Sequence, residues 1–311
     1  MTKKKILVVY YSQTRQLSEI VKSLTRPFKK DSTVEVEYEE LQMKEPFPFP
    51  WNADQFWDAF PESVLEVPFE LEPTKFNADQ AYDLVILAGQ PWFLSPSIPI
   101  NSFLHTEKAA KILKNTPVVT VMGARNMWLT AHEKVKKRLN DLQAHLCGNI
   151  TLVDKHSNLI SLITIIGWLF KGKKEGFMNI FPRSGVDDEE IRGADKFGET
   201  ILDHLLKDDF SNLQEQLLKQ NAVQIKPSLM ILEKRGAKTF PVWARFIRRK
   251  GAHGDPARKF RLKLFAYILP TGIVLLSPVT ALLTFLTKVF RKQYVNDQIN
   301  YYSYTSLEPV S

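Results

Sequence analysis

Apolar and polar residues follow one another along the first two-thirds of the chain in a pattern that predicts strands and helices in turn. Helical spacing of apolar residues appears over 17–24, 100–113, 131–142 and 187–207. Runs that are short, apolar and rich in β-branched residues, as buried strands are, precede these helices. The runs are Ile6–Tyr11, Leu84–Ala88, Val118–Met122 and Ile150–Val153. In Thr33–Tyr38 apolar and charged residues alternate, which predicts a further strand at an edge of the sheet. The alternation of strands and helices predicts an α/β fold in which right-handed crossovers place helices on both faces of a parallel sheet.

Two segments interrupt the alternation. Residues 42–80 are rich in proline and aromatic side chains and are longer than a link between strand and helix requires. This composition fits either an extended loop packed on the domain or a lid that shapes an apolar substrate pocket. Residues 155–184 contain the uncharged run Leu159–Phe170, which is too short to span a bilayer. We expect a buried helix there, or a surface element that meets lipid or a partner.

The basic character of the chain is concentrated near its C-terminus. The net charge is +8, and residues 226–263 hold twelve Lys and Arg against only Glu233 and Asp255. We therefore divide the chain into a domain of residues 1–207 and a C-terminal extension of residues 208–311. A basic segment beside an apolar one indicates a membrane surface as the partner, and no nucleic acid is expected.

The apolar part of this extension, residues 264–287, has no charged side chain. A helix of this length reaches about 36 Å, enough to cross a bilayer. Pro270 and Pro278 argue against one straight helix, because each removes a backbone hydrogen bond and crowds the preceding turn. Bases flank the segment at both ends, which gives no clear orientation across a membrane. We expect a bent segment or a re-entrant hairpin in one leaflet, the alternatives being an apolar dimer arm or a helix pair packed on the first domain.

The cysteine and histidine content limits the chemistry. Cys147 is the only cysteine, so an intramolecular disulfide and a cysteine-rich metal site are excluded. The six histidines have no metal-ligand spacing, and no metal is predicted. The apolar run that follows the basic N-terminus is shorter than a secretory core, so it predicts a strand. We therefore expect a cytoplasmic protein attached to the inner face of the cytoplasmic membrane.

A hydroxyl-rich turn follows the first predicted strand directly. Ser12-Gln13-Thr14-Arg15-Gln16-Leu17 leads from the strand into a helix, so backbone N–H groups and two hydroxyls converge at the positive end of that helix. A phosphate is the natural ligand for this arrangement, although a polar turn without a ligand gives the same pattern. The glycine patterns of nucleoside-triphosphate and dinucleotide loops are absent from the turn.

Two further loops follow predicted strands at the same edge. Gly89-Gln90-Pro91-Trp92-Phe93 comes after the third strand and Gly123-Ala124-Arg125-Asn126 after the fourth. Because parallel strands present their carboxyl ends at one edge, we expect the three loops to converge there. Either aromatic ring of the second loop is placed to stack on a planar cofactor or to pack in the core. Arg125 and Asn126 are the candidates for bonding a cofactor edge or a substrate oxygen.

These loops resemble those of flavodoxins and flavodoxin-like quinone reductases. Their first loop reads roughly Ser/Thr-x-Thr-Gly-x-Thr, which Ser12-Gln13-Thr14 matches. Arg15 stands where glycine is common and Leu17 where the last hydroxyl is common. The resemblance implies a five-stranded sheet of order 2-1-3-4-5 that binds flavin mononucleotide (FMN). It assigns the cofactor to the first-loop residues Ser12–Leu17, to Pro91–Phe93 and to Gly123–Asn126.

Four stretches resemble a narrower group, the dialkylresorcinol condensing enzymes of dialkylresorcinol and flexirubin-type pigment clusters. The stretches are Phe56–Val64, Trp92–Phe103, Gly123–Trp128 and Trp168–Lys174. The resemblance covers about residues 1–210 and implies aromatisation of a dialkyl cyclohexane-1,3-dione to a resorcinol. It also implies a small hydrophobic alkyl substrate and a ketosynthase partner.

Two other interpretations remain open. One is an NAD(P)H-dependent quinone reductase on the same scaffold, and the other is a flavin-free protein that holds a ketosynthase at the membrane. Neither the catalytic acid nor the base is fixed by the sequence. His105 and His156 are acid–base candidates, and each also fits a plain surface residue.

Overall fold

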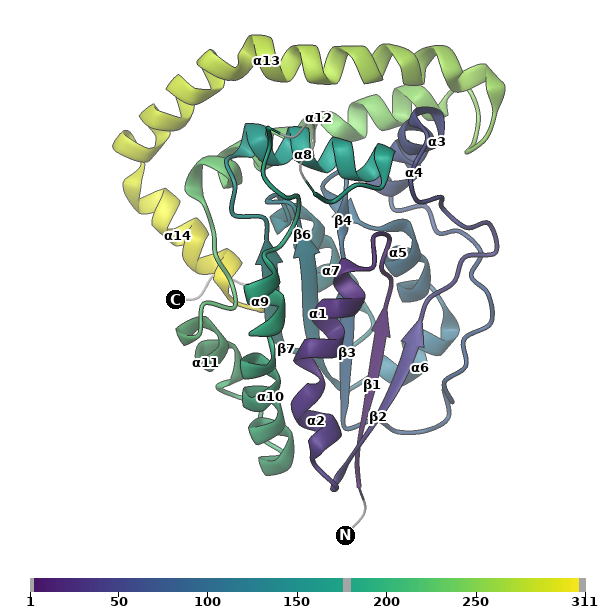
Figure 1. Cartoon of the computed structure of the whole chain (residues 1–311), viewed down its shortest axis with the longest axis vertical. Coiled ribbons are helices and arrows are strands. Elements are labelled where there is room, and N and C mark those ends of the chain that lie inside the picture. Colours follow the sequence, from purple (N-terminus) through teal and green to yellow (C-terminus); the bar gives the residue numbers. More distant parts are fainter. Residues whose placement is uncertain (1–2, 176–179, 308–311) are drawn as a thin grey trace.

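The computed structural model describes residues 3–175 and 180–307. Residues 176–179 of the predicted insertion 155–184, and the end of the predicted extension, lie outside this range. A five-stranded parallel sheet forms the centre of the molecule, in the order β2-β1-β3-β6-β7 (Figure 1). Its strands are β1 (Lys4–Tyr10), β2 (Val34–Glu40), β3 (Leu84–Gly89), β6 (Pro117–Ala124) and β7 (His145–Val153).

This strand order is that of the flavodoxin-like doubly wound fold, because β6 and β7 are the fourth and fifth strands of the sheet. The predicted fold class is confirmed. The order reverses between β1 and β3, which lie side by side although β2 intervenes in the sequence. In such sheets the crevice outside the carboxyl ends of the strands at the reversal is where ligands bind. A short antiparallel pair, β4 (Pro91–Trp92) and β5 (Ser95–Pro96), extends beyond β3.

Alternating side chains of β1 explain why both faces of the sheet are covered. Ile6 and Val8 point to one apolar core, and Leu7 and Val9 point to the other. The helices that build the first core are α1 (Gln16–Leu24), α2 (Arg26–Lys30), α9 (Asp188–Arg192), α10 (Asp195–Lys207) and α11 (Leu213–Lys219). Those on the second face are α5 (Ile98–Leu104), α6 (Glu107–Leu113) and α7 (Leu129–Asp141).

Two predicted helices are each divided in the structure. The segment 100–113 forms α5 and α6, because Thr106 caps a new helix by accepting a hydrogen bond from the Ala109 amide. The segment 187–207 forms α9 and α10, with Gly193 at the end of the first. Periodicity alone does not detect such breaks, because the apolar side chains on both sides of the break face the same core.

The two insertions lie at the carboxyl end of the sheet. The first contains α3 (Ala53–Asp58) and α4 (Phe60–Val64), and the second contains α8 (Asn158–Lys171) (Figure 1). Trp51 and Phe56 of the first insertion cluster with Leu169 and Phe170 of α8. The two insertions therefore form one apolar layer above the strand ends.

The C-terminal region packs on this layer and then returns to the sheet. It consists of α12 (Pro227–Arg248), a short 3-10 turn η2 (Pro256–Arg258), α13 (Lys259–Phe290) and α14 (Lys292–Ser303). α12 packs on α4, while its residues Met230 and Ile231 join the second core of the sheet. Val295 of α14 joins the same core. Both ends of this region are thus anchored on the α/β domain.

α13 continues through Pro270 and Pro278 but bends by 56° between Pro256–Ile273 and Pro278–Phe290. The bend agrees with the kink expected from the two prolines, yet it is too small to reverse the chain into a hairpin. Among the described helices, none is by itself both long and apolar enough to cross a membrane; the two arms of α13 reach that length and composition only when taken together.

Candidate functional site

The loop after β1 turns through a backbone conformation that usually selects glycine. Arg15 has φ 65°, in the left-handed region, and its side chain is exposed. This conformation costs an L-residue such as arginine about 1–2 kcal/mol, whereas glycine adopts it freely. Arg15 occupies the position at which the resembling families carry glycine. The structure therefore has a left-handed turn at this position in spite of the arginine.

The same turn presents the N-terminus of α1 at the carboxyl edge of the sheet. Arg15 is the N-cap residue and provides no side-chain cap to the helix. The Ser12 hydroxyl oxygen accepts from the Ser18 amide at 3.3 Å, and Thr14 is half-buried beside it. Backbone N–H groups at the start of a helix carry partial positive charge and bind anions. The donors of this loop suit a phosphate group.

Two glutamines hold the loop in place from both sides. The Gln13 amide donates to the Pro48 carbonyl at 2.6 Å, which ties the loop to the first insertion. The Gln16 amide donates to the Val186 carbonyl at 3.3 Å and accepts from the Val186 N–H at 3.2 Å. Leu17 is buried in the first core. The side chains of Gln13, Gln16 and Leu17 therefore shape the loop, which leaves its backbone N–H groups and the hydroxyls of Ser12 and Thr14 to bind a ligand.

The loop after β3 contains the β4–β5 hairpin, whose two turn residues are large and apolar. Phe93 and Leu94 both have positive φ, at 49° and 62°, where two-residue hairpins usually carry Asn-Gly. The Phe93 ring packs against Phe56 and Phe60 of the first insertion, with ring centres 4.9 and 5.3 Å away. These contacts offset the backbone strain at the tip. Phe93 therefore lies in an apolar core, and Pro91 lies at the base of the hairpin, paired with Pro96.

Trp92 points the other way, towards the first loop. Its ring makes edge contacts with Tyr11, Phe47 and Trp51, at centre distances of 6.0, 5.0 and 5.4 Å. The Trp92 side chain remains partly exposed. The Gln90 amide, oriented to satisfy both neighbours, donates to the Tyr11 carbonyl and accepts from the Gln13 N–H. The loops after β1 and β3 thus meet at the point where the strand order reverses.

The loop after β6 is bound to α8. Arg125 donates to the Asn158 side chain and to the Ser161 hydroxyl, at 3.0 and 3.1 Å. Burial lowers the pKa of Arg125 to about 10, and the nearby Asp154 carboxylate opposes this shift. The guanidinium remains charged at neutral pH. Gly123 packs closely on α1, and Ala124 is buried at the end of the strand.

Asn126 has one side-chain atom without a partner. Its amide nitrogen donates to the Ser161 hydroxyl at 3.0 Å. Its amide oxygen is buried and has no hydrogen-bond partner within the described part of the chain. A buried acceptor of this kind costs free energy unless a donor reaches it. An N–H group of a bound ligand would satisfy Asn126.

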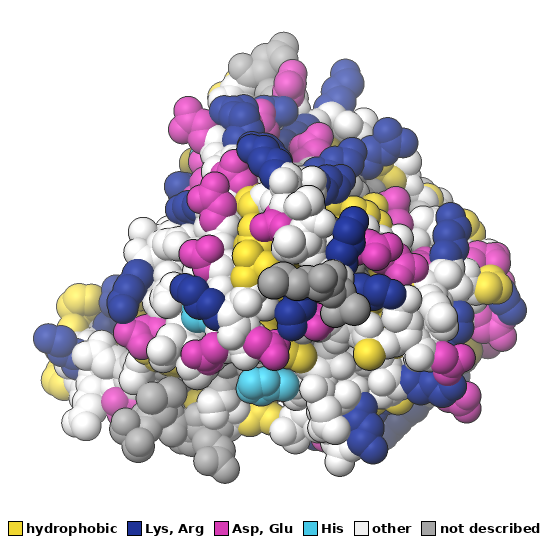
Figure 2. All heavy atoms as spheres, turned by 90° about the horizontal axis from the view of Figure 1, so that it is seen from below, with side chains coloured by type: hydrophobic (Ala, Val, Ile, Leu, Met, Phe, Trp, Pro, Cys, Tyr) yellow, Lys and Arg dark blue, Asp and Glu magenta, His cyan; other side chains and the backbone are white. Residues whose placement is uncertain are grey.

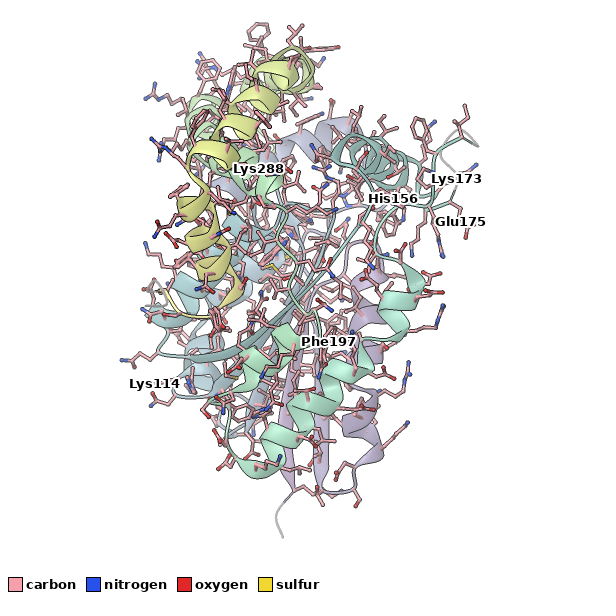
Figure 3. All side chains as sticks on the ribbon, turned by 90° about the vertical axis from the view of Figure 1, so that its left-hand side faces the viewer. Lys114, His156, Lys173, Glu175, Phe197 and Lys288 are labelled. Atoms are coloured by element: carbon pink, nitrogen blue, oxygen red, sulfur yellow. The ribbon has the colours of Figure 1, made fainter. Side chains whose placement is uncertain are left out.

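A fourth loop, after β7, adds a buried carboxylate that the sequence analysis did not identify. Asp154 is fully buried and accepts from the Gly185 N–H at 3.0 Å. Its other oxygen lies 2.7 Å from His156 Nδ1. Figure 3 shows His156 at the carboxyl edge of the sheet, near the start of α8. The signal was available, since Asp154 follows the fifth strand as the other loops follow theirs.

A cavity of about 250 Å³ lies beside this fourth loop. Lys155 and Arg183 line it, together with Ser184–Val186 and the four consecutive acids that follow. Lys155 is already paired with Glu190 at 2.7 Å. Acidic side chains outnumber basic ones in the lining, which disfavours a phosphate in this cavity.

Comparisons with known proteins give similarity at the level of the fold. No protein-family profile matches the chain, and no curated protein sequence is similar to it. Similar solved structures include a flavoprotein from Lactobacillus acidophilus NCFM in complex with FMN, at 17% identity and TM-score 0.36, covering 48% of this chain and 93% of that chain. A putative flavoprotein from Bacteroides eggerthii DSM 20697 has 19% identity and TM-score 0.38, covering 55% and 100%. Similarities this distant carry no information about activity.

Proposed function

We propose that this protein is a flavodoxin-like flavoprotein that binds FMN at the carboxyl edge of its sheet. The observation that carries the proposal is the N-terminus of α1, whose N-cap residue Arg15 provides no side-chain cap, beside the left-handed turn at Arg15 and at the reversal of strand order. Phosphate suits this loop because its donors are backbone N–H groups and the hydroxyls of Ser12 and Thr14. A lysine or arginine side chain is not needed in this loop, because the N-terminus of α1 itself carries partial positive charge.

The remaining loops supply groups that fit the rest of the cofactor. Trp92 presents a partly exposed aromatic ring next to the phosphate loop. Asn126 presents a buried acceptor that an N–H group of the flavin ring would satisfy. When bound, FMN supplies a two-electron acceptor. Arg125, charged at neutral pH, favours negative charge on a group held next to it.

In its finer form, the proposal is oxidative aromatisation of a dialkyl cyclohexane-1,3-dione to a dialkylresorcinol. The four stretches of resemblance support this substrate class. The conversion removes two electrons and two protons, and bound FMN would supply the electron acceptor. The apolar layer formed by the two insertions is compatible with alkyl chains, because it places aromatic side chains such as Phe47 and Trp51 beside the site.

The proton transfers need a base, and the Asp154–His156 pair supports that role. The Asp154 carboxylate faces His156 Nδ1, so this nitrogen carries the ring proton and Nε2 is the proton acceptor. His156 is only partly buried, which leaves its ring accessible from the carboxyl edge. We assign it as the acid–base group of the proposed reaction.

The decisive experiment is extraction of the cofactor from the purified full-length protein, followed by identification by mass. FMN and a visible flavin absorbance band are expected. A colourless protein that takes up no FMN on reconstitution would contradict the proposal and favour a flavin-free partner of a ketosynthase. The reaction is then tested by supplying a dialkyl cyclohexanedione. Formation of the resorcinol without added nicotinamide supports the aromatase, whereas nicotinamide-dependent reduction of quinones supports a quinone reductase.

A further inference from the structure

α13 exposes large apolar side chains over most of its length. Its first turns pack on α4 through the buried Leu262 and Phe265. Beyond Pro270, the large apolar residues that are between 53% and 78% exposed are Leu275, Val279, Leu282, Phe285, Val289 and Phe290. Monomeric soluble proteins rarely leave a continuous apolar surface of this kind without a partner. Figure 1 shows α13 as an arch above the end of the molecule where the site lies.

The two ends of the arch are basic. Lys259 and Lys263 are exposed at one end, and Lys288, Arg291 and Lys292 at the other, with no charged residue in 264–287. Both ends of α13 carry positive charge. A second copy of the chain packed along α13, parallel or antiparallel, would therefore place Lys and Arg side chains next to one another. An anionic surface would attract both ends at once. The charge pattern therefore favours anionic lipid over self-association.

Both ends of the arch are also fixed to the same domain. Arg258, directly before α13, is held by Asp58 and Glu62 of the first insertion. After α13, Tyr301 of α14 donates to Glu133 of α7 at 2.6 Å. A segment anchored at both ends on one side cannot cross a bilayer. The 56° bend and the exposed apolar face instead fit a helix lying in the interfacial plane.

The second insertion extends this surface. In α8, Leu159 and Ile166 are exposed, and the exposed Lys171 and Lys173 follow. Figures 1 and 3 show α8 and α13 at the same end of the molecule, beyond the carboxyl edge of the sheet. The opposite end is different. Figure 2 shows Lys and Arg interspersed there with Asp and Glu.

We propose that the exposed faces of α13 and α8 form a docking surface for an anionic lipid bilayer, with α13 embedded in the interface and its basic ends on the headgroups. The surface is independent of the proposed cofactor, since none of its residues belongs to the FMN loops. Docking in this orientation turns the carboxyl edge of the sheet towards the membrane.

Vesicle flotation of the full-length protein tests this proposal. The protein should float with vesicles of phosphatidylcholine and phosphatidylglycerol, and much less with phosphatidylcholine alone. Combining Leu275→Glu, Leu282→Glu and Phe285→Glu should abolish flotation. Combining Lys288→Glu, Arg291→Glu and Lys292→Glu should weaken binding to anionic vesicles roughly tenfold or more.

The matched control is Leu206→Glu, because Leu206 is 46% exposed on α10, away from the arch. It should float like the wild type, and far-ultraviolet circular dichroism should show every variant folded. Wild-type protein that stays away from anionic vesicles would overturn the proposal. A second result would also overturn it. If light scattering showed that the wild type is a dimer and that the variant with the three glutamates in α13 is a monomer, the exposed face of α13 would bind a second copy of the chain.

Discussion

Arg258 and Glu62 lie 196 positions apart in the sequence and form a buried bidentate pair, with Nη1–Oε1 and Nη2–Oε2 distances of 2.7 and 2.8 Å. Both side chains are almost completely buried. Arg258 Nε also donates to Asp58 at 2.6 Å. The C-terminal region is thereby locked to the first insertion, above the candidate site.

Replacing this arginine should destabilise the protein strongly. Arg258→Met leaves the Glu62 carboxylate buried without its main partner, which typically costs about 3–5 kcal/mol. Urea unfolding of the full-length protein measures the loss. The control is Arg26→Met, because the pair of Arg26 with Asp195 is much more exposed and should contribute at most about 1 kcal/mol. Equal losses in the two variants would contradict the structural role of the buried pair.

The phosphate loop is tested by Thr14→Glu. A carboxylate at this position would face the phosphate of FMN, and the repulsion should weaken binding by about tenfold or more, equivalent to about 1.4 kcal/mol. Titration of flavin fluorescence gives the affinity. Thr239→Glu, the same change at an exposed position on α12, should leave the affinity unchanged. If Thr14→Glu bound FMN with the wild-type affinity, the proposal that this loop binds the phosphate would be contradicted.

Trp92 is tested by its effect on flavin emission. If its ring stacks on the flavin, Trp92→Ala should relieve fluorescence quenching and weaken binding by ~1 kcal/mol beyond the loss of burial. Trp243→Ala removes a ring that packs with Phe246 and Phe265 instead, and should leave emission unchanged. If the flavin emission of Trp92→Ala equalled that of the wild type, Trp92 would not stack on the flavin and would only pack against its neighbouring aromatic rings.

His156 is tested by separating turnover from cofactor binding. His156→Asn removes the proton acceptor and should lower turnover by roughly a hundredfold or more, the usual contribution of a general base. The flavin absorbance spectrum should stay at its wild-type position. His105→Asn is the control, because the His105 ring bonds the Asn101 carbonyl of α5, the helix that directly precedes it. If His156→Asn kept the wild-type turnover, His156 would not be the general base of the reaction.

Acid stability should depend on His132. Burial, with a smaller contribution from Lys136, lowers the pKa of His132 to about 3. The unfolded chain takes up a proton near pH 6.5 and the folded chain does not, so stability from this residue is complete above pH 6.5 and is lost as the pH falls towards 3. Between pH 7 and 5 the loss is about 2 kcal/mol.

His132→Gln isolates this contribution, because other groups titrate in the same range. Glu233 is one of them, since burial raises its pKa to about 6, and it opposes the trend. The free energy of unfolding of the wild type relative to His132→Gln should therefore fall as the pH is lowered from 7 to 5. A constant difference would show that the buried imidazole does not control acid stability.

Much of the fold follows from local sequence. The alternation of Ile6, Leu7, Val8 and Val9 already specifies a strand buried on both faces, and the helices between strands require right-handed crossovers. These two facts bring the loops after β1, β3 and β6 to one edge. The proposed phosphate loop could be predicted for this reason: its residues are consecutive, and most of the donors that it would offer a phosphate are backbone N–H groups.

What only the tertiary structure decided is which distant side chains meet. Trp92 and Phe93 are adjacent and both aromatic, yet their rings have different neighbours because the hairpin turns at Phe93. The Trp92 ring contacts Tyr11 beside the first loop as well as Phe47 and Trp51, whereas the Phe93 ring contacts Phe56 and Phe60. Asp154 and Arg125 lie close together because β6 and β7 pair, and Arg258 finds Glu62 only after the C-terminal region folds back. Periodicity along a chain reports whether a residue is buried. It does not identify which residue a buried side chain contacts, because such contacts join residues that are far apart in the sequence and meet only when the chain folds.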